Sequence, residues 1–255
     1  MAPYLRLRQI CLVAHDLERT IAEIAAVLGL AVCHRDTGVQ KYGLANALFP
    51  IGDGYLEIVA PTRPGTAAER YLERRGGDGG YMAIFDCDDL ERRGRHLDRL
   101  GIRIAHSVGY QTYQGLQLHP RDTGGCMIEL NHTLGGDALD GPYYPAGPAG
   151  IRAPRSTLTT ALRGAEIQGA DAAALAARWG AALDRPVRPD AGVPVITLDL
   201  GYLAFTMADD GRGDGLGGVI VAVSDAAAIC ATAARRGHAV TGHTIVLCGT
   251  RFHLR

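Results

Sequence analysis

The order strand, helix, then further strands recurs along this chain of 255 residues, and it constrains the fold more than any other feature. In the first copy, residues 5–14 read as a strand and Asp16 is placed to cap a helix over 17–28 that Gly29 ends. Three more strands complete the copy, at 31–34, 45–50 and 55–60. The pattern predicts a βαβββ unit, in which one helix covers one face of a small sheet.

The second copy follows at once. A strand at 81–87 leads to a helix over 90–100, capped from Asp88 or Asp89 and ended by Gly101. A strand at 102–106 and a hairpin within residues 114–132 then complete the unit.

A stretch rich in Pro, Gly and Tyr, LGGDALDGPYYPAGPAG, interrupts the pattern and reads as a linker or a long surface loop. Two reduced copies follow it, with strands and helices at 162–167, 171–183, 195–199, 202–207, 219–223, 226–236, 244–247 and 250–254. We therefore predict an N-terminal domain over 1–133, a linker over 134–157 and a C-terminal domain over 158–255. Each domain contains two units.

The hairpin segment QGLQLHPRDTGGCMIELNH places apolar side chains on one face and Gln117, His119, Glu129 and Asn131 on the other. A carboxylate inside an apolar strand is costly without a partner, so Glu129 either faces solvent or points into a site. Glu57 stands at the equivalent place in the first unit. A pseudo-twofold axis would bring the two carboxylates into one cup, where oxygen ligands can hold a divalent cation.

Composition excludes several classes of function. The formal net charge of -1 argues against nucleic acid and against an anionic membrane surface. No apolar run is long enough to span a bilayer and no signal-peptide core is present, so we expect a cytoplasmic protein. The six cysteines form no CxxC pair, which disfavours a zinc or disulfide framework.

The segments QICLVAHDLE, GYLEIVAP, YLERRGG…DCDDLE and LHPRDTGGCMIEL resemble the vicinal oxygen chelate superfamily, in particular its glyoxalase-like and methylmalonyl-CoA epimerase-like branches. The resemblance implies an α+β fold of paired βαβββ modules, here four modules in two domains. It also implies a divalent metal (Zn, Ni, Co, Mn or Mg) held by four inward side chains. By position these are Gln9, Glu57, Met82 and Glu129.

Gln9 and Met82 stand where the superfamily usually has histidine, and a thioether is a poor ligand for these metals, so the metal itself is in doubt. We therefore expect Gln9, Glu57 and Glu129 as the metal ligands. In the C-terminal half the matching positions are Arg163, Ala204, Gly218 and His253, which predicts a degenerate cup with a structural role.

Other polar residues each allow two interpretations. Glu129 or His119 would move a proton, although His119 is as readily a turn residue beside Pro120. Asn46, Gln117, Met82 and Tyr55 would contact the substrate, or are ordinary strand and core residues. Arg74, Arg75 and Arg121 would meet an anionic ligand, or are surface charge.

Two functions remain open. The first is a metal-assisted isomerase, epimerase or lyase acting on a small oxygen-bearing molecule in the N-terminal cup. The second is a metal-free protein of the same fold that binds or sequesters a small molecule. A dioxygenase is a weaker third, because neither half supplies two histidines and a carboxylate for iron. The expected partners are a small-molecule ligand and, at most, a second copy of the chain in a homodimer.

Overall fold

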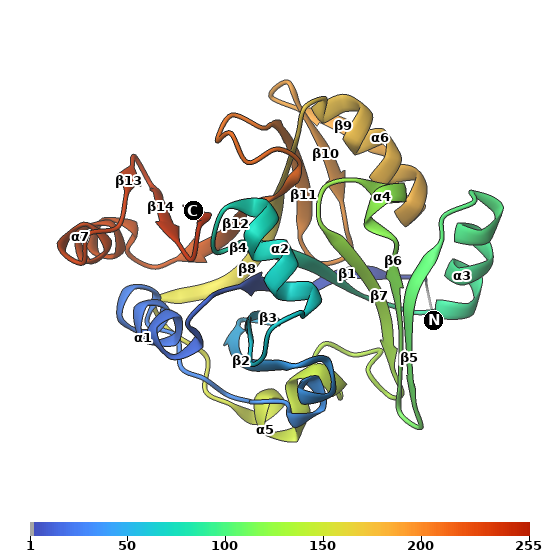
Figure 1. The fold of residues 1–255 in the computed structure, drawn as a ribbon, viewed down its shortest axis with the longest axis horizontal. Helices are drawn as coiled ribbons and strands as arrows, with labels where there is room; N and C mark the ends of the chain where they lie inside the picture. Colours follow the sequence, from blue (N-terminus) through green and yellow to red (C-terminus); the bar gives the residue numbers. More distant parts are fainter. Residues whose placement is uncertain (1–2) are drawn as a thin grey trace.

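The computed structural model describes residues 3–255, which form two sheets flanked by helices (Figure 1). The first sheet has seven strands in the order β2-β3-β1-β4-β7-β6-β5. Its strands are β1 (Leu5–Val13), β2 (Leu44–Ile51), β3 (Gly54–Pro61), β4 (Gly79–Cys87), β5 (Ile104–Tyr110), β6 (Tyr113–Leu118) and β7 (Met127–Thr133). β1 and β4 pair antiparallel at the centre, and each pairs in parallel with the last strand of its own unit. This pairing is the pseudo-twofold arrangement that the repeat predicts.

The second sheet repeats this topology with eight strands in the order β13-β14-β15-β12-β8-β11-β10-β9. Antiparallel β8 and β12 lie at its centre, and β11 and β15 pair with them in parallel. Its strands are β8 (Thr159–Gly169), β9 (Val187–Asp190), β10 (Val193–Thr197), β11 (Tyr202–Met207), β12 (Gly215–Val223), β13 (Val240–Thr241), β14 (Thr244–Leu247) and β15 (Thr250–Leu254). The predicted fold class, four βαβββ modules in an α+β protein, is confirmed.

The two helices predicted in the N-terminal half begin at predicted caps, Asp16 and Asp89. Helix α1 (Leu17–Leu28) starts where the Asp16 carboxylate accepts the backbone N–H of Arg19, and it ends at Gly29 in the left-handed conformation. Helices α3 (Leu90–Arg99), α6 (Ala172–Leu183) and α7 (Ala226–Arg235) start in the same way, from Asp89, Asp171 and Asp225. No helix within residues 3–255 is long and apolar enough to cross a membrane.

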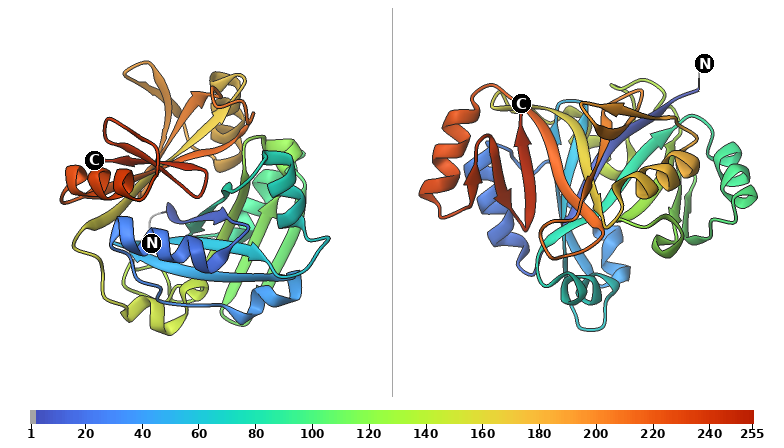
Figure 2. Two further views of the ribbon diagram at one scale, coloured as in Figure 1. Left: turned by 60° about the vertical axis from the view of Figure 1, so that its left-hand side comes forward. Right: turned by 90° about the horizontal axis from the view of Figure 1, so that it is seen from above.

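The two sheets share one hydrophobic core. Trp179 of α6 is fully buried, with its ring centroid 6.5 Å from that of Phe85 in β4 and 5.8 Å from that of Phe205 in β11. Gly80 lets β4 approach β12 closely, because a Cβ at this position would overlap Leu216. The helices also meet across the junction, α1 with α7 and α3 with α6 (Figure 2). The division into two domains, with boundaries at 133 and 158, remains our proposal.

Several elements differ from the prediction. The strand expected at 31–34 is reduced to a single bridge between His34 and Leu48. Five helical segments and the edge strands β9 and β13 are not predicted, because each is short or lies between units: η1 (Thr37–Tyr42), α2 (Ala67–Arg75), α4 (Pro120–Thr123), η2 (Tyr144–Ala146) and α5 (Gly147–Arg152). Within the predicted linker, η2 is followed by α5 (Gly147–Arg152), and Tyr143 is fully buried against the first sheet.

Candidate functional site

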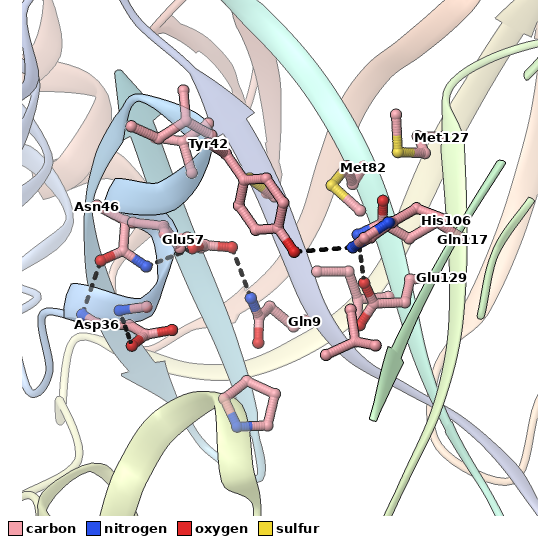
Figure 3. A pocket seen from close by; sticks show the side chains of 18 of the residues that line it. Gln9, Asp36, Tyr42, Asn46, Glu57, Met82, His106, Gln117, Met127 and Glu129 are labelled. Carbon is pink, nitrogen blue, oxygen red and sulfur yellow. Dashed lines mark hydrogen bonds between the residues drawn. The ribbon is translucent and has the colours of Figure 1, made fainter. Parts of the chain in front are cut away.

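A cavity of about 400 Å³ lies on the inner face of the first sheet, and we call it the cup. Strands β3 and β7 present Glu57 and Glu129 to the cup, and β1 and β4 between them present Gln9 and Met82. Figure 3 shows the two carboxylates on opposite sides of the cavity, with Gln9 between them. The structure therefore brings together the four residues that the superfamily resemblance selects.

Glu57 is buried and accepts a hydrogen bond on each carboxylate oxygen. Gln9 Nε2 donates to Glu57 Oε2 at 2.7 Å, and Asn46 Nδ2 donates to Glu57 Oε1 at 2.6 Å. The two amides are themselves oriented: the backbone N–H of Asp36 donates to Asn46 Oδ1 at 2.8 Å, and the Tyr143 hydroxyl donates to Gln9 Oε1 at 3.2 Å. Both amides thus point N–H groups at Glu57, an arrangement that suits the ionised carboxylate.

Glu129 is held by a second set of neutral donors. The Tyr113 hydroxyl donates to Glu129 Oε1 at 2.6 Å, and Gln117 Nε2 donates to Glu129 Oε2 at 2.8 Å. Asn131 Nδ2 adds a longer bond of 3.3 Å to Oε1. The two carboxylates therefore have similar surroundings, built from equivalent strands of the two units.

The rest of the cup is divided into an apolar wall and an aromatic rim. Met82, Met127 and Tyr81 belong to the apolar wall. At the rim, the Tyr42 hydroxyl lies 2.8 Å from His106 Nε2 (Figure 3). Lys41, the single lysine of the chain, donates to the Tyr110 hydroxyl at 2.7 Å. A ligand entering the cup meets apolar surface on one side and polar side chains on the other.

The segment before β8 completes the cup in a way that the sequence does not reveal. Tyr144 and Pro145 line the cavity, and the Tyr144 ring stacks on Tyr113 with centroids 4.8 Å apart. Tyr143 covers the adjacent end of the inner face and stacks on Tyr55 at 5.3 Å. The aromatic pair in GPYYPAG was the available signal, but a proline- and glycine-rich stretch carries no periodicity that would place it.

Residues 10–124 match the model of a family described as the glyoxalase-like domain. This stretch is similar to the glyoxalase-like domains of the vicinal oxygen chelate superfamily, and we refer to it below as the glyoxalase-like domain. Two curated relatives match the same half. The ethylmalonyl-CoA/methylmalonyl-CoA epimerase of Cereibacter sphaeroides is 24% identical over 129 residues, which are 49% of this chain and 96% of the relative. The mitochondrial methylmalonyl-CoA epimerase of Homo sapiens is 22% identical over 128 residues, 49% of this chain and 72% of the relative.

A solved structure extends the likeness in fold to both halves. A hypothetical protein from Staphylococcus aureus is 12% identical, with a TM-score of 0.69, and the match covers 98% of each chain. At this identity the match concerns the fold alone. It places the glyoxalase-like domain and the C-terminal half within one known two-sheet architecture.

Two residues expected at the site of the glyoxalase-like domain lie elsewhere. Tyr55 shares a strand face with Glu57, but Tyr143 covers it and only 1% of its surface is exposed. His119 is the N-cap of α4, where its Nδ1 accepts the backbone N–H of Arg121 at 3.3 Å, and it does not line the cup. Pro120 ends β6 one residue too early for the strand alternation to carry His119 inward. Asn46, Gln117 and Met82 do line the cup.

The residues of the cup fit a divalent metal poorly. Gln9 directs its N–H to Glu57 while its oxygen accepts from Tyr143, and Met82 offers only a thioether. Within residues 3–255, no group of three or more His, Cys, Asp or Glu side chains is arranged to hold a metal ion. Neutral donors from Gln9, Asn46, Tyr113 and Gln117 give each carboxylate oxygen a hydrogen bond, so both carboxylates have partners without a metal.

On the inner face of the second sheet, polar side chains form hydrogen bonds and ion pairs with one another. Of the four positions expected to match the ligands, only His253 is polar and inward, and its Nε2 lies 2.6 Å from Glu166 Oε2. Arg251 bonds both Glu166 and Gln168. Burial alone would raise the pKa of Glu166, but the bonds from His253 and Arg251 lower it to about 2. No signal in the sequence places Glu166 in this cluster, because Glu166 lies on β8 and not at a position that matches a metal ligand.

The surroundings of Glu57 give a prediction for its pKa. Burial raises this pKa above its ordinary value, and the negative charge of Glu129 adds to the rise, while the bonds from Asn46 and Gln9 oppose it. Asn46→Ala removes a donor that favours the ionised form, so we expect the pKa to rise further in the variant. Because the folded pKa is raised, Glu57 contributes stability at low pH that is lost as pH rises through that pKa. Carboxyl-carbon NMR titration checks the shift, and an unchanged or lower pKa in the variant would contradict it.

Proposed function

We propose that the glyoxalase-like domain binds a small carbonyl compound and moves a proton on the carbon next to the carbonyl group, as an isomerase or epimerase. The observation that carries the proposal is that Glu57 and Glu129 enter one cavity from opposite sides (Figure 3). Two carboxyl groups in this arrangement can remove a proton from one face of a carbon and return one to the other face. The matched relatives, two epimerases, support the same class of reaction.

Glu57 is the better candidate for the base. General bases work best when their pKa lies near the working pH, and burial raises the pKa of Glu57 in that direction. Since two neighbouring carboxylates in a buried cavity repel, the pair favours one shared proton. In the proposed step the ionised carboxylate of the pair takes the proton from carbon, while the other carboxyl group, carrying a proton, donates that proton to the opposite face. The reverse reaction uses the same two groups with their protonation exchanged.

The remaining residues of the cup bind and orient the ligand. Met82 and Met127 offer an apolar, adaptable wall to its hydrocarbon part. Gln117 uses one N–H of its amide for Glu129, and its second N–H can donate to the carbonyl oxygen of the ligand as negative charge develops there. The proposed proton transfer involves no metal, because the side chains that line the cup do not fit a metal ion.

A second candidate function is binding without chemistry. All four oxygens of Glu57 and Glu129 already accept hydrogen bonds from Gln9, Asn46, Tyr113 and Gln117. Such a satisfied, preformed pocket is what a metal-free sequestering protein needs. The two functions differ in one observable, the exchange of a carbon-bound proton of the ligand with solvent.

Proton exchange in deuterium oxide tests the proposal. The purified chain would be incubated with ethylmalonyl-CoA, methylmalonyl-CoA and simple 2-oxo acids, and loss of the carbon-bound proton followed by NMR. We expect exchange with at least one compound, at the same rate after treatment with EDTA. Exchange that needs added zinc, cobalt or manganese would favour the metal-assisted alternative. A compound that raises the melting temperature without exchanging would favour the sequestering function.

A further inference from the structure

A second cavity, of about 580 Å³, adjoins the cup. Ala67, Tyr81 and Met127 line both cavities, so the two cavities are direct neighbours. Helix α2, the α4 turn and residues 212–214 of the C-terminal half surround it. The second cavity therefore exists only where the two halves of the chain meet.

Positive charge dominates this second cavity, which we call the arginine cavity. One acidic residue lines it, Asp214, whose carboxylate accepts the backbone N–H of Ala170 at 3.0 Å. Across residues 3–255, the arginines of this cavity form no ion pair with a carboxylate. They are five in number: Arg70, Arg74, Arg75, Arg121 and Arg212.

Two of these arginines are fixed in place by backbone carbonyl groups. Arg75 is 6% exposed and donates to the carbonyl oxygens of Arg212, Gly213 and Asp214 at 2.6 to 3.2 Å. Arg212 donates in turn to the carbonyl of Arg75 and to those of Gly77, Asp78 and Gly249. Carbonyl groups orient a guanidinium group without cancelling its charge. The Nε atom of Arg75 is buried without a hydrogen-bond partner among the described residues, so the carbonyl groups alone hold this guanidinium group.

We propose that the arginine cavity binds the phosphate groups of the ligand whose reacting end occupies the cup. The inference rests on the proposed function, since it assigns the second part of the same ligand. Five guanidinium groups against one carboxylate match several negative charges, and the volume of the cavity exceeds what one carboxylate fills. The cup alone holds two carboxylates and repels anions, so the neighbouring positive charge is what attracts an anionic ligand.

Inorganic pyrophosphate is the probe for the arginine cavity. Titration calorimetry at low ionic strength is expected to show saturable binding that weakens as salt is raised. Arg74 and Arg121 are exposed, so Arg74→Gln and Arg121→Gln test the charge without disturbing the core. We expect each variant to bind about tenfold more weakly. The matched control is Arg99→Gln, an exposed arginine at the end of α3 that lines neither cavity, and it should stay within twofold of wild type.

The outcomes separate this inference from the proposed function. Glu129→Gln should bind pyrophosphate as the wild type does, even though it lacks the proposed proton-transfer group. For an exchanging ligand that carries phosphate groups, Arg74→Gln and Arg121→Gln should raise KM and leave the exchange rate at saturation unchanged. If pyrophosphate binds but no tested compound exchanges its proton, the proposed reaction is refuted and the assignment of the arginine cavity as a phosphate site stands. Absence of saturable binding, or equal losses in Arg99→Gln and the cavity variants, would overturn the inference.

Discussion

Glu129→Gln is expected to slow proton exchange between ligand and solvent by about 10²- to 10⁴-fold, the usual contribution of a general acid or base. The amide has the shape of the carboxyl group but cannot take up or release a proton at neutral pH. The fold should tolerate it, because the Tyr113 hydroxyl can rotate and the Gln117 amide can turn to meet the new N–H group. NMR exchange in deuterium oxide measures the loss, and thermal melting verifies the fold.

Glu57→Gln is expected to lose exchange to the same extent and to keep its fold. Asn46 cannot turn over without breaking the bond that its oxygen accepts from the Asp36 backbone, so the introduced amide keeps its oxygen toward Asn46. Its N–H group then faces Gln9, whose amide can turn over because the Tyr143 hydroxyl both donates and accepts hydrogen bonds. Glu91→Gln, an exposed glutamate on α3, is the matched control and should behave as wild type in both assays. Full exchange activity in Glu129→Gln and Glu57→Gln would disprove the proton-transfer assignment.

Trp179→Ala is expected to lower the free energy of unfolding by about 3–5 kcal/mol. Trp179 is fully buried between Phe85 of the first sheet and Phe205 of the second, and its Nε1 donates to the Gly124 carbonyl at 3.3 Å. Removal of the indole leaves a cavity at the junction of the two halves, which the strands on either side are too constrained to fill.

Equilibrium unfolding in urea checks this prediction, with Trp179→Phe as the control that keeps most of the contact and should lose much less stability. The experiment also tests our division into domains at residues 133 and 158. If the halves fold as a unit, the variant unfolds in one transition at lower denaturant. A loss below about 1 kcal/mol would contradict the role given to Trp179, because it would show that the shared core contributes little.

Local chemistry explains which parts of the fold could be predicted from the sequence. Asp16 and Asp89 cap helices through their own backbone neighbours, and Gly29 ends a helix by adopting a conformation that other residues avoid. Strand alternation depends only on neighbouring residues and on which face is buried. These signals were enough to establish the repeat and, with it, the meeting of Glu57 and Glu129 in one cavity.

Contacts distant in sequence decided the rest. Alternation put Tyr55 on the same face as Glu57, but only the folded chain shows Tyr143 lying over it, 88 residues apart by number. The sequence left Arg75 open as an anion contact or as surface charge and gave no signal for Arg212, and only the junction of the halves brings the two to one cavity. The sequence by itself determined the units, their caps and the inward carboxylates, because those depend on local geometry and periodicity. The tertiary structure alone decided what covers, fills and charges the space between the units, because packing joins residues that no local pattern relates.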